Sequence, residues 1–226
     1  MCFALTHLSF YKKNSPNSYF DRCLKRVEQD VLRMGALVEQ SFRLSHEALF
    51  DQNLEVIQQI NELDEQIDQY YRQIEFDCAQ LLTLQAPVAT DLRVISAFMQ
   101  LIRDLERIGD YAEDLAEFAM KLFPYSPHPC LSQIASMSNQ TQMMLATSLV
   151  ALADLDGTAG RRVKTMDNIV DDAYEEIYEM LAKNQVQGIV EPILLLGLVI
   201  RHLERMADHT TNIAQRVTYI VTGDRA

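Results

Sequence analysis

The chain has few of the residues that interrupt helices. Among 226 residues there are 7 glycines and 6 prolines, while hydrophobic residues make up 48%. Disordered chains are poor in apolar residues, so this composition excludes an extended disordered protein and favours a compact, mostly helical one. A chain of this length can bury a core as one large domain or as two small ones.

The four cysteines form no metal or redox motif. Cys2, Cys23, Cys78 and Cys130 are scattered without CxxC spacing, which favours reduced thiols over disulfides or zinc ligands. The opening MCFALTHLSF lacks the basic start and the small-residue cleavage site of a signal peptide. The longest apolar run, about 193–200, is too short to span a bilayer. We therefore expect a cytoplasmic protein.

Positive charge is also scarce. The chain has 32 acidic against 20 basic residues, which gives a formal net charge of −12. Proteins that bind nucleic acid need clustered basic side chains, so this balance argues against nucleic acid as the main partner. It is compatible with cation binding or with the basic surface of a partner protein.

An apolar period of three and four residues runs through most of the chain, and no segment alternates as a strand does. The period predicts six helices, at about 19–50, 54–86, 88–122, 130–155, from 159 onward, and 189–221. The segment PYSPHP at 124–129 has three prolines in six residues and cannot continue a helix, so it is predicted to link two units.

The predicted domain organisation follows from that break. We expect a flexible N-terminal extension at 1–18, a three-helix repeat at 19–123, the proline-rich linker at 124–129 and a second three-helix repeat at 130–222. Long helices joined by short loops pack antiparallel at shallow angles. The predicted fold class is all-α, with two tandem up-down three-helix bundles.

A nine-residue phrase occurs once in each predicted unit. Residues 102–110 read IRDLERIGD and residues 200–208 read IRHLERMAD, identical at six of nine positions. Each copy carries a glutamate and an aspartate four residues apart, which an α-helix places on one face within reach of a single cation. The helix before each phrase carries two aspartates at the same spacing. The acid pairs are Asp64 and Asp68, Glu106 and Asp110, Asp167 and Asp171, and Glu204 and Asp208.

A solvated acidic face is the plain alternative for any one pair. Chance alone would give about four such pairs in a chain with this many acids. The argument for a cation is the recurrence of all four pairs at matching positions in two diverged repeats. Like charges at this spacing cost about 0.2–0.5 kcal/mol per pair in a helix, and a bound cation would offset that cost.

The type of ligand indicates the type of metal. Carboxylates favour hard ions such as magnesium, calcium, manganese or iron, and four of them together favour a polynuclear centre with bridging oxygens. Without metal, mutual repulsion should raise some of their pKa values. Metal affinity should therefore fall as the solution becomes acidic.

Basic side chains recur within the phrase as well. Arg103, Arg107, Arg201 and Arg205 are predicted to pair with Glu106 and Glu204 within their helices rather than to contact an anion or a partner. His202 and His209 flank the second acid pair, but the first unit has Asp104 and Tyr111 at those positions. A ligand required by both units would not vary in this way, so neither histidine is predicted to bind metal.

The repeated LERxxD phrase, the Asp-xxx-Asp pairs on the preceding helices and the PVATDLR segment at 87–93 together resemble the PhoU family of phosphate-uptake regulators. The resemblance covers about 19–222. It implies two three-helix bundles related by a pseudo-twofold axis, with multinuclear metal clusters of iron or another divalent cation such as magnesium, manganese or zinc. The first cluster would use Asp64, Asp68, Glu106 and Asp110, and the second Asp167, Asp171, Glu204 and Asp208.

Two departures from the family pattern bear on those clusters. Where the family often has histidine after the motif aspartate and asparagine three residues later, the second unit keeps His209 and Asn212, whereas the first has Tyr111 and Asp114. The carboxylates remain, but identical metal content in the two sites is not implied.

The resemblance also implies a function. The protein would be a negative regulator of phosphate uptake and of the phosphate-starvation response, and an adaptor rather than an enzyme. Its partners would be the ATPase subunit of a phosphate ABC transporter, a sensor histidine kinase and a second copy of itself, with membrane association only through those partners.

Two other functions compete with the adaptor. A carboxylate-bridged metal enzyme of the ferritin-like kind needs Glu-x-x-His pairs, and none of the five histidines follows a glutamate at that spacing. No nucleophile–base phrase or phosphate-binding glycine loop occurs either. A helical adaptor that binds no metal stays open, because adaptors need only a surface.

Overall fold

The computed structural model describes residues 19–85, 87, 90–183 and 188–224, so the predicted extension at 1–18 and part of the segment at 87–93 lie outside the described residues. Within these ranges the chain forms six α-helices and one short 3₁₀ helix, with no strand, which confirms the all-α prediction. The helices are α1 (Tyr19–Phe50), α2 (Ile57–Gln85), α3 (Thr90–Leu122), α4 (Leu131–Asp154), α5 (Ala159–Ala182) and α6 (Glu191–Thr222), with η1 (Leu54–Val56) before α2.

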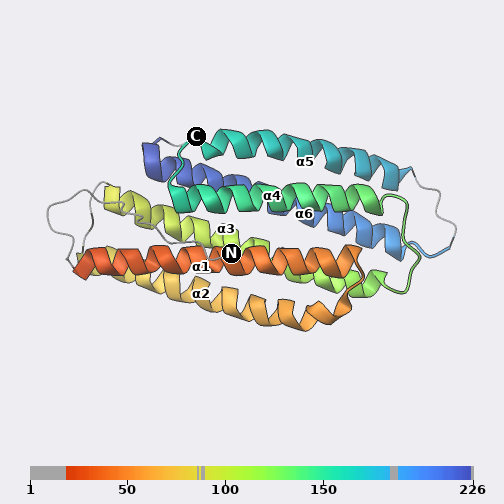
Figure 1. The fold of residues 1–226 in the computed structure, drawn as a ribbon, viewed down its shortest axis with the longest axis horizontal. Helices are drawn as coiled ribbons and strands as arrows, with labels where there is room; N and C mark the ends of the chain where they lie inside the picture. The colour runs from red at the N-terminus through yellow and green to blue at the C-terminus, as the bar shows by residue number, and fades with distance from the viewer. Residues whose placement is uncertain (1–18, 86, 88–89, 184–187, 225–226) are drawn as a thin grey trace.

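All six helices run along the long axis of the molecule, and neighbours in the chain are antiparallel (Figure 1). Helices α1 and α3 of the first unit pack against α4 and α6 of the second, α1 on α4 and α3 on α6. Among the described elements, helix α2 packs only on its own unit, against α1, α3 and η1, and α5 packs only on α4 and α6. The two units therefore share one hydrophobic core, which α2 and α5 cover from opposite sides.

Local chemistry explains where several helices begin and end. Helix α6 begins with Pro192 in its first turn, where a missing N–H costs nothing, and ends at Gly223 in the left-handed conformation, whose N–H donates to the Tyr219 carbonyl at 2.9 Å. Between α4 and α5, the Asp156 side chain accepts bonds from the Thr158 N–H at 2.9 Å and hydroxyl at 2.7 Å. These bonds lower the pKa of Asp156. Asn53, which precedes η1, makes no side-chain capping bond.

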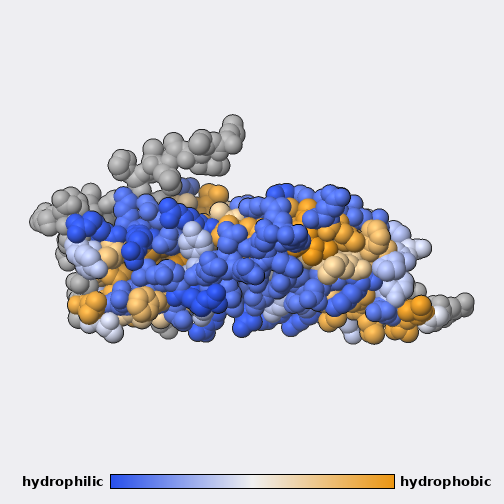
Figure 2. Space-filling model, turned by 90° about the horizontal axis from the view of Figure 1, so that it is seen from below, coloured by the Kyte–Doolittle hydropathy of each residue, from blue (hydrophilic) through white to orange (hydrophobic). Residues whose placement is uncertain are grey.

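The surface is apolar in places and charged in others. In the view of Figure 2, hydrophilic residues cover the middle of the elongated molecule and hydrophobic ones gather toward its two ends.

Cys23, Cys78 and Cys130 are free thiols. Among the described helices, none is apolar over a stretch long enough to cross a membrane.

Candidate metal centres

The first group of acids lies where α2 packs against α3. Asp64 and Asp68 come from α2, and Glu106 and Asp110 come from α3. Gly109 allows the two helices to approach closely here, since a Cβ at this position would lie 3.2 Å from the Ile67 Cδ1 atom and 3.9 Å from the Asp64 Oδ1 atom. We call these four side chains the first quartet.

The titration behaviour of the first quartet shows that its members act on one another. Burial and then Glu106 raise the pKa of Asp110 to about 6. Burial and then Asp110 and Asp68 raise the pKa of Asp64, while burial, against the opposing effect of Arg107, raises the pKa of Glu106. The predicted rise in pKa is confirmed, although burial contributes more to it than repulsion does.

Arginines hold part of the first quartet. Arg72 lies 2.8 Å from Asp68, one helical turn away on α2. Arg107 lies 3.0 Å from Asp110 and 3.5 Å from Glu106, so the prediction that it pairs within its own helix is confirmed. These guanidinium groups offset part of the negative charge when no metal is present.

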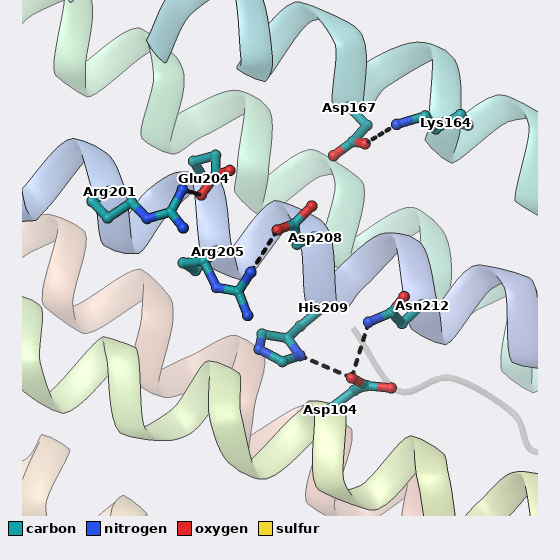
Figure 3. A network of polar contacts seen from close by, with 9 residues as sticks. All are labelled: Asp104, Lys164, Asp167, Arg201, Glu204, Arg205, Asp208, His209 and Asn212. Carbon is teal, nitrogen blue, oxygen red and sulfur yellow. Dashed lines mark hydrogen bonds and ion pairs between the residues drawn. The ribbon is translucent and has the colours of Figure 1, made fainter. Parts of the chain in front are cut away.

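The second quartet lies between α5 and α6, with Asp167 and Asp171 on α5 and Glu204 and Asp208 on α6. Arg201 pairs with Glu204 at 2.7 Å and Arg205 pairs with Asp208 at 3.0 Å, within α6 (Figure 3). Burial and then Asp208 raise the pKa of Glu204, and burial and then Asp167 raise that of Asp171. The fold therefore brings each predicted quartet together on two neighbouring helices.

Asp167 differs from the other acids because it is almost fully buried. Its side chain is 3% exposed, and its Oδ2 atom accepts a bond from the Lys164 Nζ atom at 2.6 Å (Figure 3). Its Oδ1 atom is buried without a hydrogen-bond partner. A buried carboxylate oxygen without a partner is costly, and it marks a position where a cation would be stabilising.

The donor set fits hard cations, because every member offers carboxylate oxygens. In the described part of the chain, however, no three His, Cys, Asp or Glu side chains converge closely enough to hold a metal ion as they are placed. Several of the carboxylates are instead paired with basic groups on the same helix. A metal ion at either quartet would have to displace some of these pairs.

A polar contact between α3 and α6 was not foreseen from the sequence. His209 of α6 lies with its Nδ1 atom 2.8 Å from the Asp104 Oδ1 atom of α3, and the Asn212 amide donates to the same oxygen at 3.3 Å (Figure 3). His202 of α6 lies with its Nε2 atom 3.0 Å from the Asp114 Oδ2 atom of α3.

These contacts are related by the pseudo-twofold arrangement of the repeats. His202 occupies the position in α6 that Asp104 occupies in α3, and His209 corresponds to Tyr111. The contact between His202 and Tyr111 is therefore the counterpart of the contact between Asp104 and His209. His202 packs edge-on against Tyr111, with ring centroids 4.9 Å apart, whereas Asp104 is bonded to His209. The strongest difference within the repeated phrases, Asp104 against His202, and the difference just after them, Tyr111 against His209, thus both lie at the contact between units. That coincidence was the available signal in the sequence.

The fold and the sites define a class of protein: a duplicated three-helix protein with one carboxylate quartet between the second and third helices of each unit. The sequence model of the PhoU domain matches residues 31–119 and 134–217, one copy in each unit. The chain belongs to the PhoU family.

Individual relatives agree with that assignment. A Synechocystis protein described as "Phosphate-specific transport system accessory protein PhoU homolog" is 64% identical over 219 residues, which covers 96% of this chain and 98% of that protein. The crystal structure of PhoU from Pseudomonas aeruginosa superposes with a TM-score of 0.86 at 33% identity, over 91% of this chain and all of that one. The regulatory protein PhoU from Streptococcus pneumoniae gives a TM-score of 0.83 at 29% identity, over 92% and 99%.

Proposed function

We propose that this protein is a negative regulator of phosphate uptake and of the phosphate-starvation response. The observation that carries the proposal is the 64% identity, over nearly the whole of both chains, to a protein described as a phosphate-specific transport system accessory protein. Deleting the gene should leave phosphate-starvation genes expressed in phosphate-rich medium. Normal repression in the deletion strain would contradict the regulatory role.

Regulation would occur through contact rather than catalysis. The proposed partners are the ATPase subunit of a phosphate ABC transporter and a sensor histidine kinase, met in the cytoplasm by the elongated helical surface. A pull-down from phosphate-replete cells should recover both partners. Recovery of neither, with the bait folded and soluble, would remove the adaptor role.

The quartets are proposed to hold a multinuclear cluster of iron or another divalent cation. Metal would supply positive charge that links α2 to α3 and α5 to α6, and it would give the orphaned Asp167 oxygen a partner. Asp110→Asn combined with Asp208→Asn should lower the metal content measured by elemental analysis. Glu117→Gln combined with Glu179→Gln is the matched control, because it removes two exposed acids from α3 and α5 outside the quartets.

The uncharged exposed face of α4 supports a homodimer. The helix contains no charged residue before Asp154, and one face exposes Met143 (57%) and Val150 (59%) together with Ser132, Ser136 and Asn139. In a twofold contact each side chain near the axis meets its own copy, so charge there is repulsive, all the more between chains of formal charge −12.

This face is testable by a single substitution. Met143→Lys should convert a dimer to a monomer in sedimentation analysis. Ile169→Lys, which adds the same charge at an exposed position of α5, is the matched control and should not. A dimer that survives Met143→Lys would place the contact elsewhere.

A further inference from the structure

We propose that Lys164 is a built-in competitor for cations at the second quartet, so that the two quartets are not equivalent and the first one fills first. This inference rests on the proposed metal binding. It concerns which side chains oppose that binding, and it is carried by differences between the two units at matching positions.

The second quartet already holds a cationic group at its most buried member. The Lys164 Nζ atom lies 2.6 Å from the Asp167 Oδ2 atom, although the lysine side chain itself is 56% exposed. An incoming metal ion therefore competes with a charge that is already in place.

The first unit has no lysine at the corresponding position. Asp64 matches Asp167, and the residue three positions before Asp64 is Asn61, an exposed neutral side chain at the surface of α2. The first unit also has an additional acid. Glu113 lies three residues after Asp110 on α3, on the same side of that helix, whereas the matching residue of α6 is Thr211.

The local charge consequently differs between the units. In the first, four quartet carboxylates and Glu113 are accompanied by two paired guanidinium groups, those of Arg72 and Arg107. In the second, four carboxylates are accompanied by three paired cationic groups, those of Lys164, Arg201 and Arg205. The first quartet therefore has the stronger attraction for a divalent ion.

Lysine is suited to a displaceable role. Its ammonium group is a single charge on a flexible stem, without the planar fork that fixes arginine on a carboxylate. The Lys164 stem lies largely in solvent, so the group can leave Asp167 without disturbing the core. The partnerless Oδ1 atom of Asp167 remains beside it as the oxygen that a cation would gain.

The test is a calorimetric titration of Mn²⁺ into the full chain after treatment with chelator and dialysis. Wild type is compared with Lys164→Gln, with Lys164→Arg and with Asn61→Lys, which places a lysine at the matching position of the first unit. Lys183→Gln is the control, since it removes the same charge from an exposed ion pair at the other end of α5. Asp110→Asn and Asp208→Asn assign each binding step to the first or second quartet.

We expect wild type to bind in two steps, the tighter one lost in Asp110→Asn. Lys164→Gln should strengthen the weaker step by about 10-fold or more, the scale on which neighbours of metal ligands act, while Lys164→Arg and Lys183→Gln should not strengthen it. Asn61→Lys should weaken the tighter step by a similar factor. Its exposed position makes it safe for folding, so it tests the inference even if Lys164→Gln unfolds the chain.

The outcomes separate this inference from the function on which it rests. Two steps of wild-type strength in both Lys164→Gln and Asn61→Lys would overturn the competitor role and leave metal binding intact. A tighter step that is lost in Asp208→Asn would overturn the order of filling. Absence of Mn²⁺ binding in every protein would overturn metal binding at the quartets, and the inference with it.

Discussion

Replacing Asp110 with asparagine should stabilise the metal-free protein. Asp110 lies on α3 beside Glu106, and its pKa is raised from 3.8 to about 6, by burial first and then by Glu106. Because the folded state binds this proton more tightly than the unfolded chain, ionisation of the carboxyl costs stability. The cost is complete above the folded pKa and disappears below the unfolded one.

The size of the effect follows from the shift. A change of about two pKa units corresponds to about 3 kcal/mol as an upper limit. The Asp110 side chain is 36% exposed, so solvent screens much of that interaction and we expect a gain of about 1 kcal/mol at pH 8. At pH 5, between the two pKa values, the gain should fall to about half of that.

The assay is urea denaturation followed by circular dichroism, in the presence of EDTA, at pH 8 and at pH 5. Glu117→Gln is the control, because Glu117 is an exposed acid of the same helix paired with Lys121, and its loss should change stability by less than about 0.5 kcal/mol. A metal-free Asp110→Asn protein less stable than wild type at pH 8 would refute the reasoning. It would mean that the pair with Arg107 outweighs burial and repulsion.

Three further predictions follow from other buried contacts. Glu28 on α1 is 8% exposed, and burial raises its pKa to about 7. Glu28→Gln should therefore stabilise the fold by about 2 kcal/mol at pH 8 and by progressively less below pH 7. Equal urea midpoints for the variant and wild type at pH 8 would count against this. Asp104→Ala should lower the free energy of unfolding by about 1–3 kcal/mol, because it removes the bond to His209. A double-mutant cycle with His209→Ala should show a coupling energy between the two side chains. Additive losses of stability would show that the two side chains do not interact. Gly109→Val should cost about 1–3 kcal/mol by overpacking against α2, and it should weaken Mn²⁺ binding at the first quartet. Gly109→Ala should be much milder, because the second unit carries alanine at the matching position. If thermal melts and Mn²⁺ titrations show equal effects for the valine and alanine variants, the close approach of α2 and α3 is contradicted.

The sequence predicted the helices because helical periodicity is local. Buried side chains such as Val31, Met34 and Val38 recur every three or four residues, and that spacing marks the inner face of α1 whatever packs on it. Predicted ends differed from the observed ones by up to three residues, the largest difference at the start of α2, where the chain first forms η1. The acid pairs were equally accessible, because both members of a pair lie on one helix.

Contacts between separate helices were less accessible to the sequence. The lysine on Asp167 follows the same local rule as the arginine pairs, but its importance depends on Asp167 being buried, which the packing of α5 against α4 and α6 decides. Likewise, the influence of Asp64 on the pKa of Glu113 crosses from α2 to α3, and no spacing along either helix specifies it.

The amino-acid sequence by itself determined that this chain contains two sets of three helices with matching acid pairs, because both properties repeat along the chain. Only the tertiary structure decided that the two sets share a core through α1 with α4 and α3 with α6, that His209 meets Asp104 across that contact, and that one quartet contains a buried, half-satisfied aspartate. The physical reason is that relative rotation and approach of helices depend on how many side chains fit together at once, and that fit is a property of the assembled molecule.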